Sequence, residues 1–77
     1  MAKLPRLTGK ELAKVAEKLG FVHMHTTGSH MAFRHSDGRK AIIPHHAREE
    51  IGPGLLLKII KSDFRITRED FERMLRE

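Results

Sequence analysis

The sequence predicts an α+β fold in which one helix precedes a three-stranded antiparallel sheet and a second helix, with a short extra helix at the C-terminus. Two patterns support this order. Apolar residues recur at helical spacing near both ends of the chain, and apolar and polar residues alternate between positions 21 and 43. Because 77 residues are too few for two hydrophobic cores, we expect a single domain over residues 1–77.

The first helix is predicted over residues 9–19. Thr8 and Glu11 have the spacing of a capping box, in which the hydroxyl and the carboxylate accept hydrogen bonds from backbone N–H groups at the helix start. Gly20 is a typical residue for the end of such a helix, because it adopts left-handed backbone angles without a Cβ clash. The apolar side of the helix consists of Leu12, Val15, Ala16 and Leu19.

Three short antiparallel strands are predicted at about 21–26, 29–35 and 39–43, separated by turns at 26–28 and 36–38 that each contain a glycine. On the middle strand, Met31 and Phe33 share one face. The opposite face carries His30, Ala32 and Arg34. We therefore expect one face of the sheet to enter the core and the other to carry polar chemistry.

Residues 44–54 contain two prolines and two glycines and predict an irregular connection, after which the second helix begins near Pro53. The apolar residues of this helix are Leu55, Leu56, Ile59 and Ile60. A final short helix is predicted after Thr67, which has the position of a cap, with Ile66 packing on Phe71 as a hydrophobic staple.

The charge balance predicts an anionic partner, since 15 basic residues face 10 acidic ones, a formal net charge of +5. No apolar run approaches the roughly 20 residues of a membrane span, so we expect a soluble protein with no membrane contact. Cysteine is absent, which excludes disulfides and thiolate zinc sites and fits a cytoplasmic location. Four Phe without Trp or Tyr disfavour a platform for stacking single-stranded bases.

His30 is the first candidate for catalysis, because the turn residues Gly28 and Ser29 deliver it to the start of a strand. An imidazole titrates near neutral pH and can give or take a proton at a phosphate. On spacing alone, a solvated sheet position explains His30 equally well. A nucleophilic Ser29–His30 pair is disfavoured, because neighbouring strand residues point to opposite faces. Ser29 is better explained as a residue that shapes the turn or contacts phosphate.

A metal site is the less favoured interpretation of the other histidines. His23 and His25 are two apart and are predicted to share a strand face, while His45 and His46 follow the third strand. Structural zinc usually needs four protein ligands, and no cysteine or carboxylate is placed to complete the set. We therefore expect exposed polar side chains here and no metal.

Several cations could form a surface that contacts phosphates, although lysines on an amphipathic helix are as often simply its solvated side. Both interpretations stay open until their relative orientation is known. The residues are Lys10 and Lys14 on the first helix, Lys58 and Lys61 on the second, and Arg34 on the polar face of the sheet.

Taken together, these segments resemble the HicA family of toxins, small RNA-cleaving partners of HicB antitoxins. The matching residues extend from Leu7 to about Asp63. They comprise Leu7-Thr8-Gly9-Lys10-Glu11-Leu12, Leu19-Gly20-Phe21, Gly28-Ser29-His30, Arg34-His35, Asp37-Gly38-Arg39, Ile43-Pro44, His46 and Gly54-Leu55-Leu56-Leu57-Lys58-Ile59-Ile60. The sequence departs from the family pattern at Leu55, where a small polar residue is usual.

The resemblance implies a fold like a double-stranded-RNA-binding domain and an endoribonuclease that acts on messenger RNA. It also implies that His30 is the catalytic residue, that no metal or other cofactor is needed, and that a HicB-like antitoxin is the protein partner. His46 matches a recurring family histidine and is expected to contact RNA. A second proton carrier is not identified from the sequence, and His46 and water are its candidates. We expect a free monomer that forms a hetero-oligomer with its antitoxin. The alternative is a non-catalytic RNA-binding module.

Overall fold

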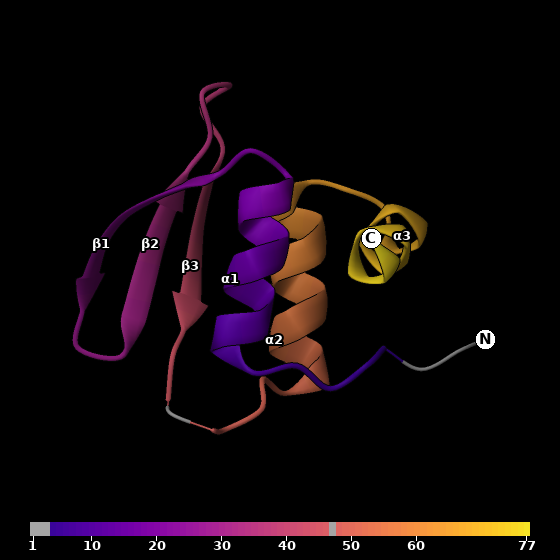
Figure 1. The fold of residues 1–77 in the computed structure, drawn as a ribbon, viewed down its shortest axis with the longest axis horizontal. Helices are drawn as coiled ribbons and strands as arrows, with labels where there is room; N and C mark the ends of the chain where they lie inside the picture. Colours follow the sequence, from indigo (N-terminus) through magenta and orange to yellow (C-terminus); the bar gives the residue numbers. More distant parts are fainter. Residues whose placement is uncertain (1–3, 47) are drawn as a thin grey trace.

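The helices and strands follow the predicted order (Figure 1) in a computed structural model that describes residues 4–46 and 48–77. The α+β class, with one helix, three antiparallel strands and then C-terminal helices, is confirmed. The elements are helix α1 (Gly9–Lys18), strands β1 (Val22–Thr27), β2 (His30–Arg34) and β3 (Lys40–Pro44), helix α2 (Pro53–Lys58), π-helix η1 (Ile59–Phe64) and helix α3 (Arg68–Arg76).

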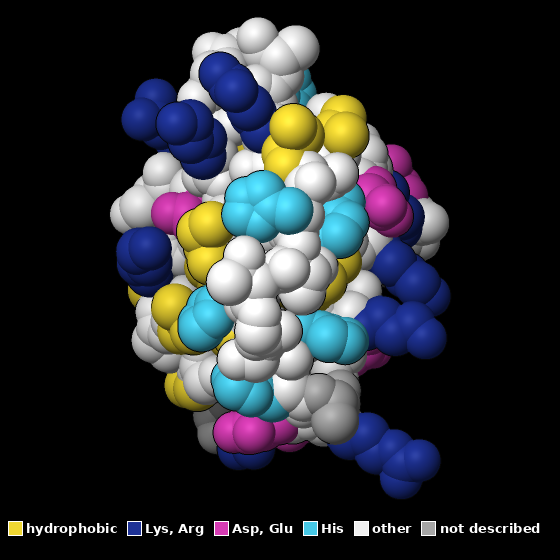
Figure 2. All heavy atoms as spheres, turned by 90° about the vertical axis from the view of Figure 1, so that its left-hand side faces the viewer, with side chains coloured by type: hydrophobic (Ala, Val, Ile, Leu, Met, Phe, Trp, Pro, Cys, Tyr) yellow, Lys and Arg dark blue, Asp and Glu magenta, His cyan; other side chains and the backbone are white. Residues whose placement is uncertain are grey.

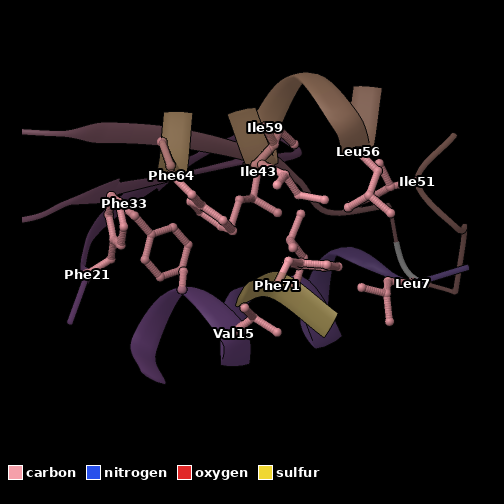
Figure 3. Packing of buried hydrophobic residues seen from close by; sticks show 14 residues of the cluster. Leu7, Val15, Phe21, Phe33, Ile43, Ile51, Leu56, Ile59, Phe64 and Phe71 are labelled. Atoms are coloured by element: carbon pink, nitrogen blue, oxygen red, sulfur yellow. The ribbon is translucent and has the colours of Figure 1, made fainter. Parts of the chain in front are cut away.

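The sheet has the order β1-β2-β3, and its helices cover one face (Figure 1). Helix α2 continues into η1 through right-handed helical residues, so the two form one uninterrupted helix. Helix α3 lies farther from the sheet and contacts α1 and η1. Figure 3 shows how side chains from both layers point toward one another in the core. The buried apolar residues are Leu7, Leu12, Val15, Ala16, Phe21, Phe33, Ala41, Ile43, Ile51, Leu56, Ile59, Ile60, Phe64 and Phe71.

Both ends of α1 form as the sequence predicts. The Glu11 backbone N–H donates to the Thr8 hydroxyl at 3.3 Å, and the Thr8 N–H donates to the Glu11 carboxylate at 2.9 Å, which completes the capping box. The Glu11 carboxylate also accepts from the Thr8 hydroxyl at 3.1 Å, and the hydrogen bonds that it receives from the Thr8 backbone and then from the Thr8 hydroxyl lower the pKa of Glu11. At the other end, Gly20 has φ of 98°, and the Phe21 N–H donates to the Ala16 carbonyl in a Schellman motif.

The β1–β2 hairpin differs from the prediction because β1 contains a bulge. His23 pairs with Phe33 and His25 pairs with Ala32, so Met24 is an extra residue on β1. His23 accordingly lies on the Phe33 side, with ring centroids 5.2 Å apart, and its Nε2 lies 2.8 Å from the Thr26 hydroxyl. The prediction that His23 and His25 share one face is therefore wrong.

The β2–β3 hairpin is hydrogen-bonded to the end of η1. Gly38 has φ of 100°, as its turn requires, and the Asp37 carboxylate accepts from the Arg39 backbone N–H at 3.0 Å and from its Nε at 2.8 Å. These hydrogen bonds, the backbone one first, lower the pKa of Asp37. The Arg39 guanidinium also donates to the Phe64 carbonyl and lies over the Phe21 ring, 5.1 Å from its centroid.

His35 has a structural position between this hairpin and the end of α1. The Asp37 N–H donates to His35 Nδ1 at 3.1 Å, so Nε2 carries the proton that is donated to the Leu19 carbonyl at 3.1 Å. The imidazole edge also packs on Phe21 at 5.1 Å. A β-carbon on Gly20 would lie 2.9 Å from His35 Nε2, so glycine serves the close approach as well as the helix end.

Helix α3 is capped by Thr67, whose hydroxyl accepts from the Asp70 N–H at 3.0 Å. Ile66 packs against the core cluster that contains Phe71, and its direct staple contact with Phe71 stays a prediction. Among the described residues, no helix is both long and apolar enough to cross a membrane.

Candidate functional site

Three segments that are distant in sequence meet at one end of the sheet: the β1–β2 turn, the end of β3 and the start of α1 (Figure 1). His30 opens β2 and pairs with Pro44, the last residue of β3. The next backbone N–H, that of His45, donates to the Ser29 carbonyl at 2.6 Å. A β-carbon on Gly9 would lie 2.0 Å from the Pro44 carbonyl oxygen, so α1 begins directly against the end of β3. Backbone contacts thus fix this end of the molecule.

His30 and His46 lie side by side at this end. Their ring centroids are 6.5 Å apart with an interplanar angle of 78°, and both residues are exposed. Strand β2 positions His30, and the chain directly after β3 positions His46. From the sequence, His30 was selected through its turn, and His46 was an expected RNA contact and, beside water, a candidate second proton carrier. The structure adds the distance between the two rings.

The turn before His30 leaves its backbone accessible. Gly28 has φ of 59°, and a β-carbon placed there would meet nothing within 4 Å. Ser29 is half-buried, and its carbonyl accepts the hydrogen bond from the His45 N–H. Gly28 and Ser29 thus form a two-residue loop, one position later than predicted, because β1 extends to Thr27. The loop shapes the turn, as expected, and exposes backbone next to the two histidines.

Sequence reasoning gave His45 only a possible place in a metal site. The residue is half-buried, and its Nδ1 is buried without a hydrogen-bond partner among the described residues. Its Cα would lie 3.1 Å from a β-carbon on Gly9. The only sequence signal for this position was the pair of adjacent histidines after Pro44, which does not reveal which ring faces outward.

The predicted basic residues are distributed over different parts of the surface. Lys10 is exposed in the first turn of α1, at the end that carries the two histidines. Arg34 closes β2, four residues and about 13 Å along the strand from His30. Lys58 lies 3.5 Å from the Asp63 carboxylate, which also accepts from the Ile42 N–H of β3 at 3.4 Å. Lys61 lines a hollow between η1 and α3. Of these cations, the structure brings Lys10 to the histidine end and leaves Arg34 and Lys61 elsewhere.

Figure 2 shows histidines along the side of the molecule formed by the sheet, with Lys and Arg side chains around its margin. Within residues 4–46 and 48–77, no three His, Cys, Asp or Glu side chains form a group that could hold a metal ion. The bulge in β1 places His23 and His25 on opposite faces of the sheet, so these two side chains cannot bind the same ion.

The Leu55 position, where the sequence departs from the family pattern, lies in the first turn of α2 and is 44% exposed. This helix begins at Pro53 after Gly52, and no side chain caps it. The leucine therefore neither enters the core nor serves as a cap.

Comparison with protein families identifies the family to which this chain belongs. The family model described as "HicA toxin of bacterial toxin-antitoxin" matches residues 9–62, more than half of the chain. The chain belongs to the HicA toxin family. It is therefore the toxin component of a toxin–antitoxin system, and the resemblance found in the sequence is confirmed. The HicA match covers α1, the sheet, α2 and most of η1, and α3 lies outside it. Among curated proteins, no significant match is found.

Proposed function

We propose that this HicA-family toxin is a metal-independent endoribonuclease that cleaves messenger RNA with His30 as a general acid/base. The observation that carries the proposal is the position of His30, exposed at the open end of the sheet beside a second exposed histidine. An imidazole that a polynucleotide can reach is the side chain best suited to move protons near neutral pH.

The proposed reaction is transesterification within the RNA backbone. His30 takes the proton of a ribose 2′-hydroxyl as its oxygen attacks the neighbouring phosphorus. The O2′–P bond forms, the P–O5′ bond breaks, and the departing 5′-oxygen takes up a proton. The products are a 2′,3′-cyclic phosphate and a 5′-hydroxyl end. A well-placed imidazole accelerates such a proton transfer by typically ~10²- to 10⁴-fold.

RNA binding is proposed to rest on phosphate contacts at the same end of the molecule. Lys10 is exposed in the first turn of α1, at the histidine end, and the open backbone around Gly28 lets a phosphate approach beside Ser29. Gly28, Ser29, Lys10 and His46 would thus contact the phosphates on either side of the cleaved bond.

The more distant cations would hold flanking parts of the RNA. Lys58 remains 60% exposed despite its ion pair with Asp63, and such surface pairs are weak, so its charge stays available to a phosphate. Arg34 and Lys61 lie outside the histidine end and would contribute mainly through the net charge of +5.

The protein partner proposed is a HicB-type antitoxin that forms a hetero-oligomer with the otherwise monomeric toxin. The open face of the sheet supports a protein partner, because Ile42 is 49% exposed and shares the face of its pairing partner Ala32 and of His30. An antitoxin with an acidic, partly apolar surface would cover Ile42 and compete with RNA for His30.

The test compares purified wild type with His30→Ala on RNA. We expect the variant to lose cleavage and keep its melting temperature, and excess chelator to leave wild-type cleavage unchanged. His25→Ala is the matched control, because His25 is an exposed histidine on the same sheet face. A fully active His30→Ala variant would end the proposal. In cells, induced wild type should stop growth and deplete intact messenger RNA, and His30→Ala should do neither.

A non-catalytic RNA-binding module is the second candidate, favoured by the order of one helix, three strands and a helix that resembles double-stranded-RNA-binding domains. Folded wild-type protein that binds RNA and yields no fragments would support this alternative.

A further inference from the structure

We infer that His46 is the second proton carrier of the reaction, so that His30 and His46 act from two sides on one RNA phosphate. This inference rests on the proposed ribonuclease function and adds to it the residue that protonates the leaving group. Three observations support it. The rings of His30 and His46 are close together, other histidine rings already contact protein groups, and backbone hydrogen bonds hold the segments that carry His30 and His46.

The separation of the rings suits one phosphate. In-line transfer places the attacking 2′-oxygen and the departing 5′-oxygen on opposite sides of phosphorus. Each imidazole nitrogen must then come within about 2.6–3.2 Å of its own oxygen. With centroids 6.5 Å apart, the rings are close enough to share one phosphodiester, and no hydrogen bond joins them among the described residues.

Three of the other histidines have ring nitrogens that already contact protein groups. His23 bonds the Thr26 hydroxyl, His25 lies 3.4 Å from the Thr27 hydroxyl, and His35 bridges Leu19 and Asp37. Within residues 4–46 and 48–77, the rings of His30 and His46 make no hydrogen bond to a protein group. Their four ring nitrogens are therefore available to a substrate.

The backbone holds the two histidines in a fixed relationship. His30 pairs with Pro44, and the His45 N–H donates to the Ser29 carbonyl, so the segments before His30 and before His46 are joined directly. Gly9 supports this segment from the other side. The ring of His45 is half-buried, which leaves His46 as the outward-facing member of the pair.

The proton balance assigns one role to each ring. Neutral His30 takes the proton of the 2′-hydroxyl, and protonated His46 gives a proton to the 5′-oxygen as the P–O5′ bond breaks. After the step His30 is protonated and His46 is neutral, and exchange with water restores both. No oxidant, reductant or metal enters the balance.

The decisive experiment changes the leaving group. Wild type first defines a cleavage position in an RNA oligonucleotide, and a second oligonucleotide then carries sulfur in place of the 5′-bridging oxygen at that position. A departing thiolate needs no proton. His46→Ala should cleave the unmodified RNA ~10²- to 10⁴-fold more slowly than wild type and should recover most of this loss on the sulfur-bridged RNA. His30→Ala should be slow on both.

His25→Ala serves as the control and should match wild type on both substrates. If His46→Ala does not fold, His46→Gln replaces it, because glutamine keeps a polar side chain and cannot carry the proton. The inference fails if His46 variants cleave unmodified RNA within a few-fold of wild type, or if they are impaired equally on both substrates, as a simple RNA contact would be. An active His30→Ala variant, or an inactive wild type, would instead overturn the ribonuclease proposal itself.

Discussion

Gly9 and the Pro44 carbonyl approach so closely that a β-carbon on Gly9 would lie 2.0 Å from the oxygen. The contact joins the first residue of α1 to the last residue of β3, immediately before the segment that carries His46. Glycine at this position therefore serves the packing of two elements rather than a turn, since its φ is not positive. The contact makes the position of the candidate site depend on the start of α1.

Gly9→Ala should destabilise the protein by about 1–3 kcal/mol, because the new methyl group collides with backbone that cannot rotate away. Elsewhere in a helix the same substitution usually stabilises, by up to about 1 kcal/mol. Gly54→Ala in α2 is the matched control, because a β-carbon on Gly54 would meet nothing within 4 Å. Denaturant titration measures both variants. Equal stabilities for Gly9→Ala and wild type would contradict the contact.

Phe71→Ala should lower the free energy of unfolding by about 3–5 kcal/mol, although α3 lies outside the family match. The reason is that Phe71 is fully buried in the core shared with η1. Leu55→Ala is a suitable control, since Leu55 is 44% exposed and its loss should change stability by less than about 0.5 kcal/mol. Thermal unfolding compares them. If Phe71→Ala melts as wild type does, α3 contributes nothing to the core.

The order of helices and strands could be predicted because each boundary has a local cause. The Thr8–Glu11 capping box, the left-handed Gly20 and the Asp37-Gly38 turn are all read from two to four neighbouring residues. The bulge at Met24 could not be predicted, because every residue of β1 is exposed. Without an alternation of buried and exposed residues, a one-residue change of register leaves no trace in the sequence.

The candidate site was only partly predictable for a related reason. The sequence indicates His30 through its turn, and family resemblance adds His46, yet their meeting depends on the pairing of His30 with Pro44 across two strands. Such a pairing between distant residues is set by the whole sheet. The positions of the lysines could not be predicted for the same reason. Lys10 and Lys61 both belong to amphipathic helical segments in the sequence, yet Lys10 lies at the start of α1 and Lys61 lines the hollow beside α3.

Glu11→Gln should reduce the pH dependence of stability in the acid range. Hydrogen bonds from Thr8 hold the pKa of Glu11 below its ordinary value of 4.5. A carboxyl with a lowered folded-state pKa stabilises the protein above its unfolded pKa, and this contribution is lost as pH falls through the folded value. The difference between wild type and Glu11→Gln should therefore be largest near neutral pH and shrink below about pH 4. Denaturant midpoints measured from pH 7 to pH 3 test this, and a constant difference would contradict it.

Lys10→Ala should weaken RNA binding more than Lys61→Ala does. Lys10 lies at the end that carries His30 and His46, whereas Lys61 lines the hollow beside α3. Measured with the His30→Ala protein, so that the RNA stays intact, loss of one phosphate contact should lower the slope of log affinity against log salt by about 0.7 for single-stranded RNA. The Lys61→Ala slope should stay closer to the parent value, because its charge acts only at a distance. Equal slopes for the two variants would contradict the proposal that RNA binds at the end of the molecule that carries Lys10.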